Sequence, residues 1–219
     1  MIKQKQTLLT LLLLLFFTFI QAYEVKLKLL LEGPLQGSYM STLIHGELKK
    51  MNPSAPLDAV DIVQIELRNS IQSQAVETKN AYLLKDGTVV DYVTLQPNLV
   101  FNASGNAYYI VVKHRNHLPI ASKTAVNHQS FCDLTLPTQV YGEAKLVNGK
   151  SVMIAGNVHN EPGDVNEINA SDFFYVSQAM DNHLTGYVSE DVNLDGVVNE
   201  KDLQIVKNHS EKLYFSQIQ

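Results

Sequence analysis

The twelve-residue stretch DVNLDGVVNEKD, from Asp191 to Asp202, constrains the fold more than any other part of the sequence. Calcium takes six to eight oxygen ligands, and a loop of this length supplies them from positions one, three, five, seven and twelve. These positions are occupied by Asp191, Asn193, Asp195, Val197 and Asp202. A solvated turn does not need this combination together with Gly196 at the sharp sixth position. The pattern therefore predicts a Ca²⁺ site with these five residues as ligands.

The surroundings of the loop differ from those of a paired calcium sensor in two ways. Asp202 closes the loop where a sensor loop has Glu, and the preceding LTGYVSE lacks the pattern of an amphipathic helix. A helix is predicted after the loop, over DLQIVKNHSEKL, and Val198 is expected to anchor the loop against a neighbour. The inward residues expected on that helix are Leu203, Val206 and Leu213.

A loop followed by a single helix resembles the dockerin family, whose modules carry two such F-hand units. The resemblance implies an upstream copy, and GDVNEINASDFFYVSQAM is similar, although it is three residues shorter. On that alignment the ligands of an additional, upstream metal site are Asp164, Asn166, Asn169 and Asp172. An alternative alignment begins at GNVHNE and needs an insertion before Asp172. It uses Asn157, His159 and Glu161.

The helix expected after the upstream copy is DFFYVSQAM. Phe173, Val176 and Met180 recur at helical spacing, so this helix is expected to pack against the one that follows the second loop. A domain this small buries little apolar surface, and two acids that face inward repel each other. Calcium is therefore expected to stabilise this region as well as to occupy it.

The first 22 residues read as a secretory signal peptide. Lys3 and Lys5 precede an apolar run from Leu8 to Ile20, and a small residue, Ala22, ends the segment. A membrane anchor is the competing interpretation. Cleavage after Ala22 removes two lysines and no acid, so the formal charge moves from −5 to −7. The mature chain is expected to be secreted, with no further segment able to span a membrane.

Hydrophobic residues alternate with polar ones through the first two-thirds of the chain, which predicts strands. The pattern is clear in EVKLKLLLEG, DIVQIELRN and NAYYIVVKHRN, and Asp86-Gly87 suits a tight hairpin turn. The predicted fold is mainly β. An antiparallel β-sandwich over residues 23–145 is followed by a small α-helical calcium module over residues 153–215.

The stretches KLKLLLEGPL, VDIVQIELRN, AYLLKDGTVVD and YYIVVKHRNHLPIAS carry a second resemblance. In this order they look like a β-module of exported surface proteins of Bacteroidetes and allied bacteria, which are often labelled haemagglutinin-like or dockerin-containing. The match covers most of residues 25–122. It implies a bacterial extracellular or cell-surface location and a β-sandwich architecture, and it leaves the activity undefined.

The HRNH stretch is the most chemically suggestive part of the strand region. It comprises His114, Arg115, Asn116 and His117. A strand directs residues i and i+3 to opposite faces, so the two imidazoles can converge only if the strand ends between them. A binding or catalytic site is one interpretation. The other is a strand end whose polar side chains form hydrogen bonds to neighbouring loops.

The remaining sequence argues against several functions. The chain is acidic, with ten Asp or Glu and one basic residue, Lys201, between Ala155 and Val206. This charge argues against a nucleic-acid partner. No nucleophile elbow, phosphate-binding loop or HExxH helix is present. Cys132 is the only cysteine, so no intramolecular disulfide forms.

The sequence therefore predicts a secreted, non-enzymatic, Ca²⁺-binding protein. The dockerin resemblance implies docking onto a cohesin-like or other cell-surface protein, and the surface-protein resemblance implies adhesion or glycan recognition. The alternative is a secreted enzyme or carbohydrate-binding protein with its site near residues 114–117. A third interpretation makes the calcium module a rigid spacer clamped to the sandwich.

Overall fold

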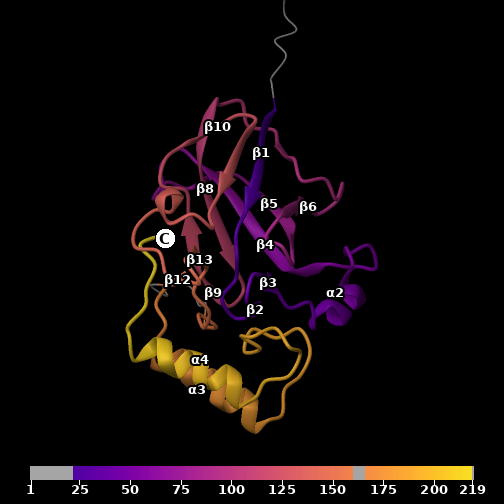
Figure 1. The fold of residues 1–219 in the computed structure, drawn as a ribbon, viewed down its shortest axis with the longest axis vertical. Coiled ribbons are helices and arrows are strands. Elements are labelled where there is room, and N and C mark those ends of the chain that lie inside the picture. The colour runs from indigo at the N-terminus through magenta and orange to yellow at the C-terminus, as the bar shows by residue number, and fades with distance from the viewer. Residues whose placement is uncertain (1–21, 160–165, 219) are drawn as a thin grey trace, which may run out of the picture.

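The computed structural model describes residues 22–159 and 166–218. The predicted signal peptide therefore falls almost wholly outside the described residues. Two β-sheets pack face to face, and two helices, α3 and α4, lie side by side at one end of them (Figure 1).

The smaller sheet has three strands in the order β11-β1-β7. Its strands are β1 (Tyr23–Lys28), β7 (Leu99–Phe101) and β11 (Ser130–Asp133). The pairing of β1 with β7 is antiparallel, as predicted, whereas β1 and β11 run parallel. Parallel neighbours need a long crossover, and residues 29–129 separate these two strands. A local alternation pattern carries no information about this direction.

The larger sheet has six strands, ordered β10-β8-β4-β5-β6, with β9 also paired to β8. Its strands are β4 (Ala59–Arg68), β5 (Ala75–Leu84), β6 (Val89–Asp91), β8 (Ala107–His114), β9 (His117–Ala121) and β10 (Val126–Asn127). All pairings in this sheet are antiparallel. The predicted Asp86-Gly87 turn joins β5 to β6, and Gly87 has the positive φ of +91° that such a turn requires.

The inner faces of the two sheets form one hydrophobic core. The residues predicted to point inward are buried there, and they are Val25, Leu27, Leu29, Leu31, Val63, Ile65 and Leu67. Cys132 is buried in the same core, and burial raises the pKa of its thiol to about 12. The predicted sandwich is therefore confirmed in its architecture and in the orientation of these strands.

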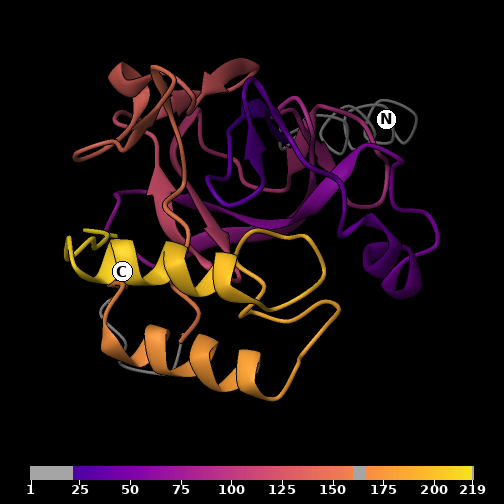
Figure 2. The ribbon, with the colours of Figure 1, turned by 60° about the horizontal axis from the view of Figure 1, so that its bottom comes forward.

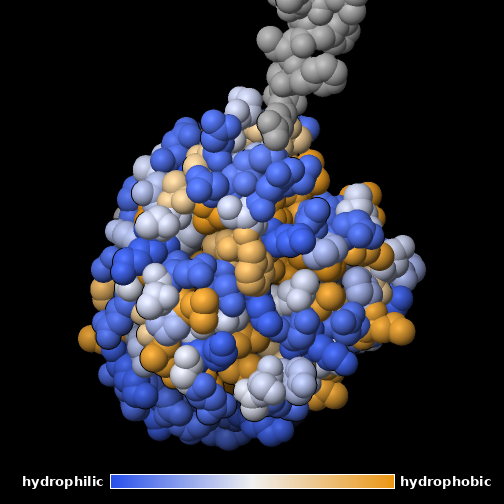
Figure 3. All heavy atoms as spheres, turned by 45° about the horizontal axis from the view of Figure 1, so that its top comes forward, coloured by the Kyte–Doolittle hydropathy of each residue, from blue (hydrophilic) through white to orange (hydrophobic). Residues whose placement is uncertain are grey.

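Short elements complete the sandwich. They are β2 (Leu35–Gln36), β3 (Tyr39–Met40), α2 (His45–Met51), a 3₁₀ turn η1 (Pro137–Gln139), β12 (Leu146–Val147) and β13 (Lys150–Ser151). The sandwich extends beyond residue 145, because Val152 and Met153 still lie in its core. On the face drawn in Figure 3, hydrophobic side chains gather near the centre and hydrophilic ones surround them.

The helix pair consists of α3 (Ala170–Asp181) and α4 (Glu200–Ser210). Figure 2 shows α4 between α3 and the sandwich, so α3 is the outer helix. A second core joins the pair, and it contains Val176 and Val206, with Phe173 and Met180 packed against it as predicted. Leu118 of β9 also belongs to this core and connects it to the sandwich.

The tail after α4 folds back onto the sandwich. The prediction that Leu213 lies on the inward face of the last helix is wrong, because α4 ends at Ser210 and Leu213 is 73% exposed. Ile218 is buried instead, in a small cluster with Ile71, Val111 and Ala121 on the other side of the large sheet. None of the helices in the described part of the chain is long and apolar enough to cross a membrane.

Candidate calcium site and its anchor on the sandwich

The second loop, Asp191–Asp202, holds two fully buried carboxylates. Asp191 accepts hydrogen bonds from the backbone N–H of Asp195 at 3.1 Å and of Gly196 at 2.9 Å. Gly196 has a φ of +91°, so the sharp turn stands at the predicted sixth position. Asp202 accepts from the backbone N–H groups of Val192 at 2.8 Å and Asn193 at 2.9 Å. Asp202 therefore connects the end of the loop to its beginning, and Asp191 connects the beginning to the sharp turn.

Burial shifts the titration of both carboxylates in the same direction. It raises the pKa of Asp191 to about 6, and the negative charge of Asp202 adds to this effect while the Gly196 hydrogen bond opposes it. Burial also raises the pKa of Asp202, to which the charge of Asp195 contributes. Among the described residues, no lysine or arginine forms a salt bridge with Asp191 or Asp202, although a distant Arg115 weakly favours the charged form of Asp191. Among the described residues, the two buried carboxylates thus have no neutralising side chain in a salt bridge with them.

The remaining predicted ligands border the same loop. The side-chain oxygen of Asn193 lies 2.8 Å from the backbone nitrogen of Asp195, and the Val197 carbonyl accepts from the Asn199 side chain at 3.0 Å. Asp195 is close to the exposed Lys201, with 3.7 Å between the ammonium nitrogen and a carboxylate oxygen. Val198 is buried in the helix-pair core, as expected for the residue that anchors the loop.

The donor set fits a hard cation that binds oxygen. Carboxylate, amide and carbonyl oxygens are the ligands Ca²⁺ takes in proteins, and no nitrogen or sulfur side chain stands at a ligand position of this loop. Within residues 22–159 and 166–218, no three His, Cys, Asp or Glu side chains form a group that could hold a metal ion. A metal in the second loop must therefore draw on Asn193 and the Val197 carbonyl in addition to the acids.

The upstream loop repeats this scaffold in a register that favours the alternative alignment. Asp172 accepts from the backbone N–H groups of Val158 at 2.8 Å and His159 at 3.0 Å, just as Asp202 accepts from Val192 and Asn193. Asn157 therefore corresponds to Asp191. We call the segment from Asn157 to Asp172 the first loop, and residues 160–165 of it, including Asp164 and Glu161, lie outside the described residues.

Asn166 was predicted as a ligand of the upstream site, but its side chain is bound to the C-terminal tail. Its side chain donates to the Ile218 carbonyl at 3.1 Å, and its own carbonyl accepts from Ser216, so it fastens the tail. Asn169 is the N-cap of α3, where its side chain accepts from Ser171 at 2.7 Å. Its counterpart Asn199 caps α4 in the same way, through Lys201 at 2.9 Å. Both helices thus begin with an Asn whose backbone N–H is bound by the closing Asp.

The HRNH stretch forms a tight hairpin between β8 and β9, which we call the anchor hairpin (His114–His117). The strand ends after His114, so the two imidazoles converge, with 3.0 Å between their Nδ1 atoms. The Nε2 atom of His117 accepts from the backbone N–H of Gly33 at 3.2 Å. This acceptor role requires a neutral ring at Nε2, and burial lowers the pKa of His117 well below its usual value.

Asp61 lies at the other end of this histidine pair. Its carboxylate is 3.1 Å from His114 Nε2 and 3.1 Å from Arg115 Nε, and it accepts from the Tyr187 hydroxyl. Burial alone would raise the pKa of Asp61, but the hydrogen bond and charge of His114 and the charge of Arg115 outweigh it and lower the pKa to about 2. Arg115 also donates to the Val188 carbonyl, at the approach to the second loop.

Asn116 connects the anchor hairpin to both loops. Its side-chain nitrogen donates to the carbonyls of Ser189 at 2.9 Å and Asp191 at 2.8 Å, where the second loop begins. Its backbone carbonyl accepts from Gly156 at 2.9 Å, where the first loop begins. The hydrogen-bonding role predicted for HRNH is therefore what these side chains perform.

The sequence did not predict two further contacts between the second loop and the sandwich. Leu194, at position four, is fully buried in the core of the sandwich rather than in that of the helix pair. Gly33 lies against the loop backbone so closely that a Cβ atom there would be 2.0 Å from the Val192 carbonyl oxygen. The only sequence signals are an apolar residue within a polar loop and a glycine in the distinctive Glu-Gly-Pro stretch.

Comparisons with known proteins give weak structural similarity only. No family model matches the chain, and no curated protein matches it. A chain from a crystal structure of a C-terminal interface mutant of the type II cohesin–X-dockerin complex from Acetivibrio cellulolyticus has a TM-score of 0.48 and 14% identity, and the similarity covers 85% of this chain and 94% of that chain. A chain from the N-terminal interface mutant has a TM-score of 0.43 and 13% identity, with 86% and 92% covered.

Proposed function

We propose that this chain is an extracellular docking or adhesion protein in which the second loop binds Ca²⁺ and thereby fixes the helix pair on the sandwich. The observation that carries the proposal is the pair of fully buried carboxylates, Asp191 and Asp202, in a twelve-residue loop with oxygen ligands at the required spacing. Inward acids without a cation repel each other, and a divalent ion removes that cost.

Calcium binding would stabilise the folded state of this chain. Extracellular modules commonly bind Ca²⁺ with dissociation constants of about 10⁻⁴–10⁻³ M. At a hundredfold excess of ion over the dissociation constant, binding stabilises the folded state by about 2.7 kcal/mol. Because Leu194 packs into the sandwich core and Asn116 binds the start of the loop, this stabilisation would reach the sandwich as well as the helices.

The docking part of the proposal is supported by the outer helix. α3 exposes Phe174 by 58% and Tyr175 by 37%, and these rings contact each other at 5.8 Å between centroids. Large exposed aromatic side chains favour a protein partner, because they bury much area with little loss of conformational freedom. The resemblance to dockerin modules implies the same kind of partner, a cohesin-like or other cell-surface protein.

The alternative site at residues 114–117 has less support from the geometry. Asn116 and His117 are fully buried, His114 is buried, and all three are engaged in internal hydrogen bonds. A catalytic or binding group must reach its substrate within hydrogen-bonding distance. The observed contacts favour a structural role for these side chains.

Calorimetric titration of the full mature chain with CaCl₂ tests the calcium proposal. We expect one binding event for the second loop, and we expect Asp191→Asn, which removes a charge without changing size, to weaken it at least tenfold. Glu200→Gln is the matched control, since Glu200 is an exposed acid of the same loop that does not stand at a predicted ligand position. Absence of heat and of any calcium-dependent rise in Tm in the wild type would refute the proposal.

Docking is tested separately by incubating the tagged protein with intact bacterial cells and with their culture medium, in Ca²⁺ and in EGTA. We expect retention in Ca²⁺ that falls in EGTA, in Asp191→Asn and in the double variant Phe174→Ala, Tyr175→Ala, but not in Glu200→Gln. Retention that is unaffected by EGTA, with calcium binding intact in the titration, would assign the loop to a rigid spacer instead.

A further inference from the structure

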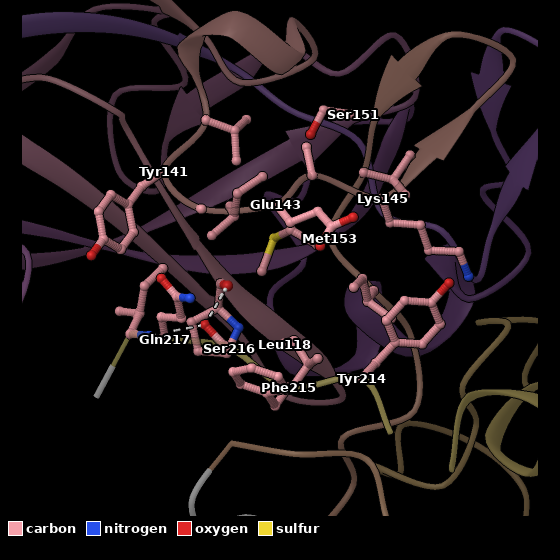
Figure 4. A pocket seen from close by; sticks show the side chains of 18 of the residues that line it. Leu118, Tyr141, Glu143, Lys145, Ser151, Met153, Tyr214, Phe215, Ser216 and Gln217 are labelled. Carbon is pink, nitrogen blue, oxygen red and sulfur yellow. Dashed lines mark hydrogen bonds between the residues drawn. The ribbon is translucent and has the colours of Figure 1, made fainter. Parts of the chain in front are cut away.

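A hollow of about 660 Å³ lies between the sandwich and the C-terminal tail. Its walls come from β9, from residues 140–154 and from residues 212–218. Figure 4 shows Tyr141 and Lys145 on opposite sides of it, with Phe215 and Ser216 along a third side. Its size is within the range of small-molecule sites, which often form where two parts of a fold meet.

The tail wall of this hollow is held in place from both ends. The Ser216 hydroxyl donates to the Pro119 carbonyl at 3.1 Å, and the Ser216 backbone N–H donates to the Asn166 carbonyl at 2.8 Å. Ile218, two residues later, is buried against the large sheet. The hollow is therefore a built feature with fixed walls.

Aromatic rings form much of its apolar lining. Tyr141, Tyr214 and Phe215 all line it, and Phe215 is 62% exposed at its edge. Exposed aromatic rings offer flat apolar faces to a ligand that carries C–H groups. Below them, Leu118 and Met153 form a buried apolar floor.

One buried polar group in the lining has no partner. Ser151 is fully buried, and its hydroxyl makes no hydrogen bond with any of the described residues. Buried hydroxyls nearly always have a partner, so an orphan that lines a hollow indicates a missing one. The hydroxyl can be redirected by rotation about the Cα–Cβ bond, between staggered positions.

Three charged side chains line the hollow, Glu143, Lys145 and Lys212. Lys145 is bound to the Glu32 carboxylate, and Lys212 is exposed. Glu143 is exposed at the edge and forms no salt bridge with the described residues, so the site carries an available acceptor. An exposed carboxylate acceptor suits a ligand that carries hydroxyl donors.

We propose that this hollow binds a neutral saccharide unit. A sugar ring has apolar C–H faces that fit against Tyr141 and Phe215, and hydroxyls that can bond to Ser151 and to the Glu143 carboxylate. The aromatic rings suit the apolar faces of the sugar, and the Glu143 carboxylate suits its hydroxyl donors. The site is distinct from the second loop and from the anchor hairpin, and it does not depend on calcium chemistry.

The test is a binding screen on the full mature chain in saturating CaCl₂, with soluble tetrasaccharides of glucose, mannose, xylose and N-acetylglucosamine, read by saturation-transfer NMR and calorimetry. We expect at least one of the four to bind. Tyr141→Ala and Phe215→Ala should each weaken that binding roughly tenfold or more. Phe131→Ala, a similarly exposed ring on β11, is the matched control and should leave binding unchanged.

Ser151→Ala separates a binding role from a structural one. Removing a hydroxyl that lacks a protein partner should leave Tm unchanged or raise it, while sugar affinity falls several-fold. The proposal is overturned if none of the four tetrasaccharides binds, if binding survives Tyr141→Ala and Phe215→Ala, or if Ser151→Ala lowers Tm and leaves affinity unchanged. Selective binding of a peptide at this hollow would overturn it as well.

Discussion

The two loops before α3 and α4 share a backbone scaffold and differ at their first and third positions. In both, a closing Asp binds the amides of the second and third loop residues and caps the following helix together with an Asn. The first loop begins with neutral Asn157, whereas the second begins with Asp191. His159, at the third position of the first loop, stacks on Tyr175 at 4.7 Å instead of presenting a short amide.

This difference separates two roles of the closing acid. Asp172 shows that three amide hydrogen bonds are reason enough to keep an Asp at the helix start. Asp202 makes the same three bonds and in addition faces a second buried acid. The second loop is also the one that reaches into the sandwich core through Leu194. Among the described residues, the pair of buried acids suited to a cation therefore belongs to the loop that packs into the sandwich core.

That connection can be broken at Gly33, where we expect the largest effect. Gly33→Ala places a Cβ atom 2.0 Å from the Val192 carbonyl oxygen, which belongs to the backbone and must move. We expect a loss of about 3 kcal/mol in the free energy of unfolding, measured by urea denaturation. Gly46→Ala in α2 is the control, since its Cβ meets nothing within 4 Å, and it should be neutral or slightly stabilising.

The anchor of the second loop should also depend on pH through Asp61. Its folded pKa of about 2 lies below the ordinary value of 3.8, so its stabilisation is complete above about pH 4 and is lost as the pH falls toward 2. We expect the free energy of unfolding of the wild type to fall by about 2.5 kcal/mol between pH 4 and pH 2 because Asp61 becomes protonated. The Asp61→Asn variant should be less stable than the wild type at pH 7. Its free energy of unfolding should lack this contribution to the decrease between pH 4 and pH 2.

The control for this pH measurement is Asp181→Asn, which removes an exposed acid on α3. Its unfolding free energy should follow the wild-type slope between pH 4 and pH 2. A slope that is the same in Asp61→Asn and in the wild type would contradict the role of this carboxylate.

The two closing acids can be compared directly by Asp172→Asn and Asp202→Asn. An amide offers one acceptor oxygen where the acid offers two, so we expect each change to cost about 2 kcal/mol in EGTA. On addition of millimolar Ca²⁺, the Tm of the wild type and of Asp172→Asn should rise, while that of Asp202→Asn should not. A calcium response lost equally in both variants would place an ion in the first loop too.

The smallest effect is expected for Asn116→Ala, which removes the two side-chain hydrogen bonds to Ser189 and Asp191. We expect a loss of about 1–2 kcal/mol, together with weaker calcium binding by calorimetry. Asn80→Ala, at an exposed position of β5, is the control and should change neither quantity. If Asn116→Ala also leaves calcium affinity unchanged, the hairpin does not support the loop.

Much of the fold follows from local patterns in the sequence. The alternation around Val63 and Ile65 fixed which strand face is buried, and the spacing of Phe173, Val176 and Met180 identified the inner side of α3. The ligand positions of the second loop lie within twelve consecutive residues. Such features are visible because their periods are shorter than a single element.

Other features depend on contacts between distant segments and left little local signal. The parallel pairing of β1 with β11 joins residues a hundred positions apart, and the burial of Leu194 depends on a sandwich core built from other strands. The register of the first loop was ambiguous because neither alignment has twelve residues: one is three residues shorter than the second loop, and the other needs an insertion before Asp172. Only the amide contacts of Val158 and His159 distinguish the two alignments.

The position of Leu194 limits how this protein can be divided. A fragment that begins near residue 153 would expose this side chain to water, and the remaining sandwich would keep an empty socket in its place. The calcium-loop region is therefore not an independent domain that recombination could transfer alone to another protein. In evolution and in recombinant expression alike, this region needs the sandwich strands into which Leu194 packs.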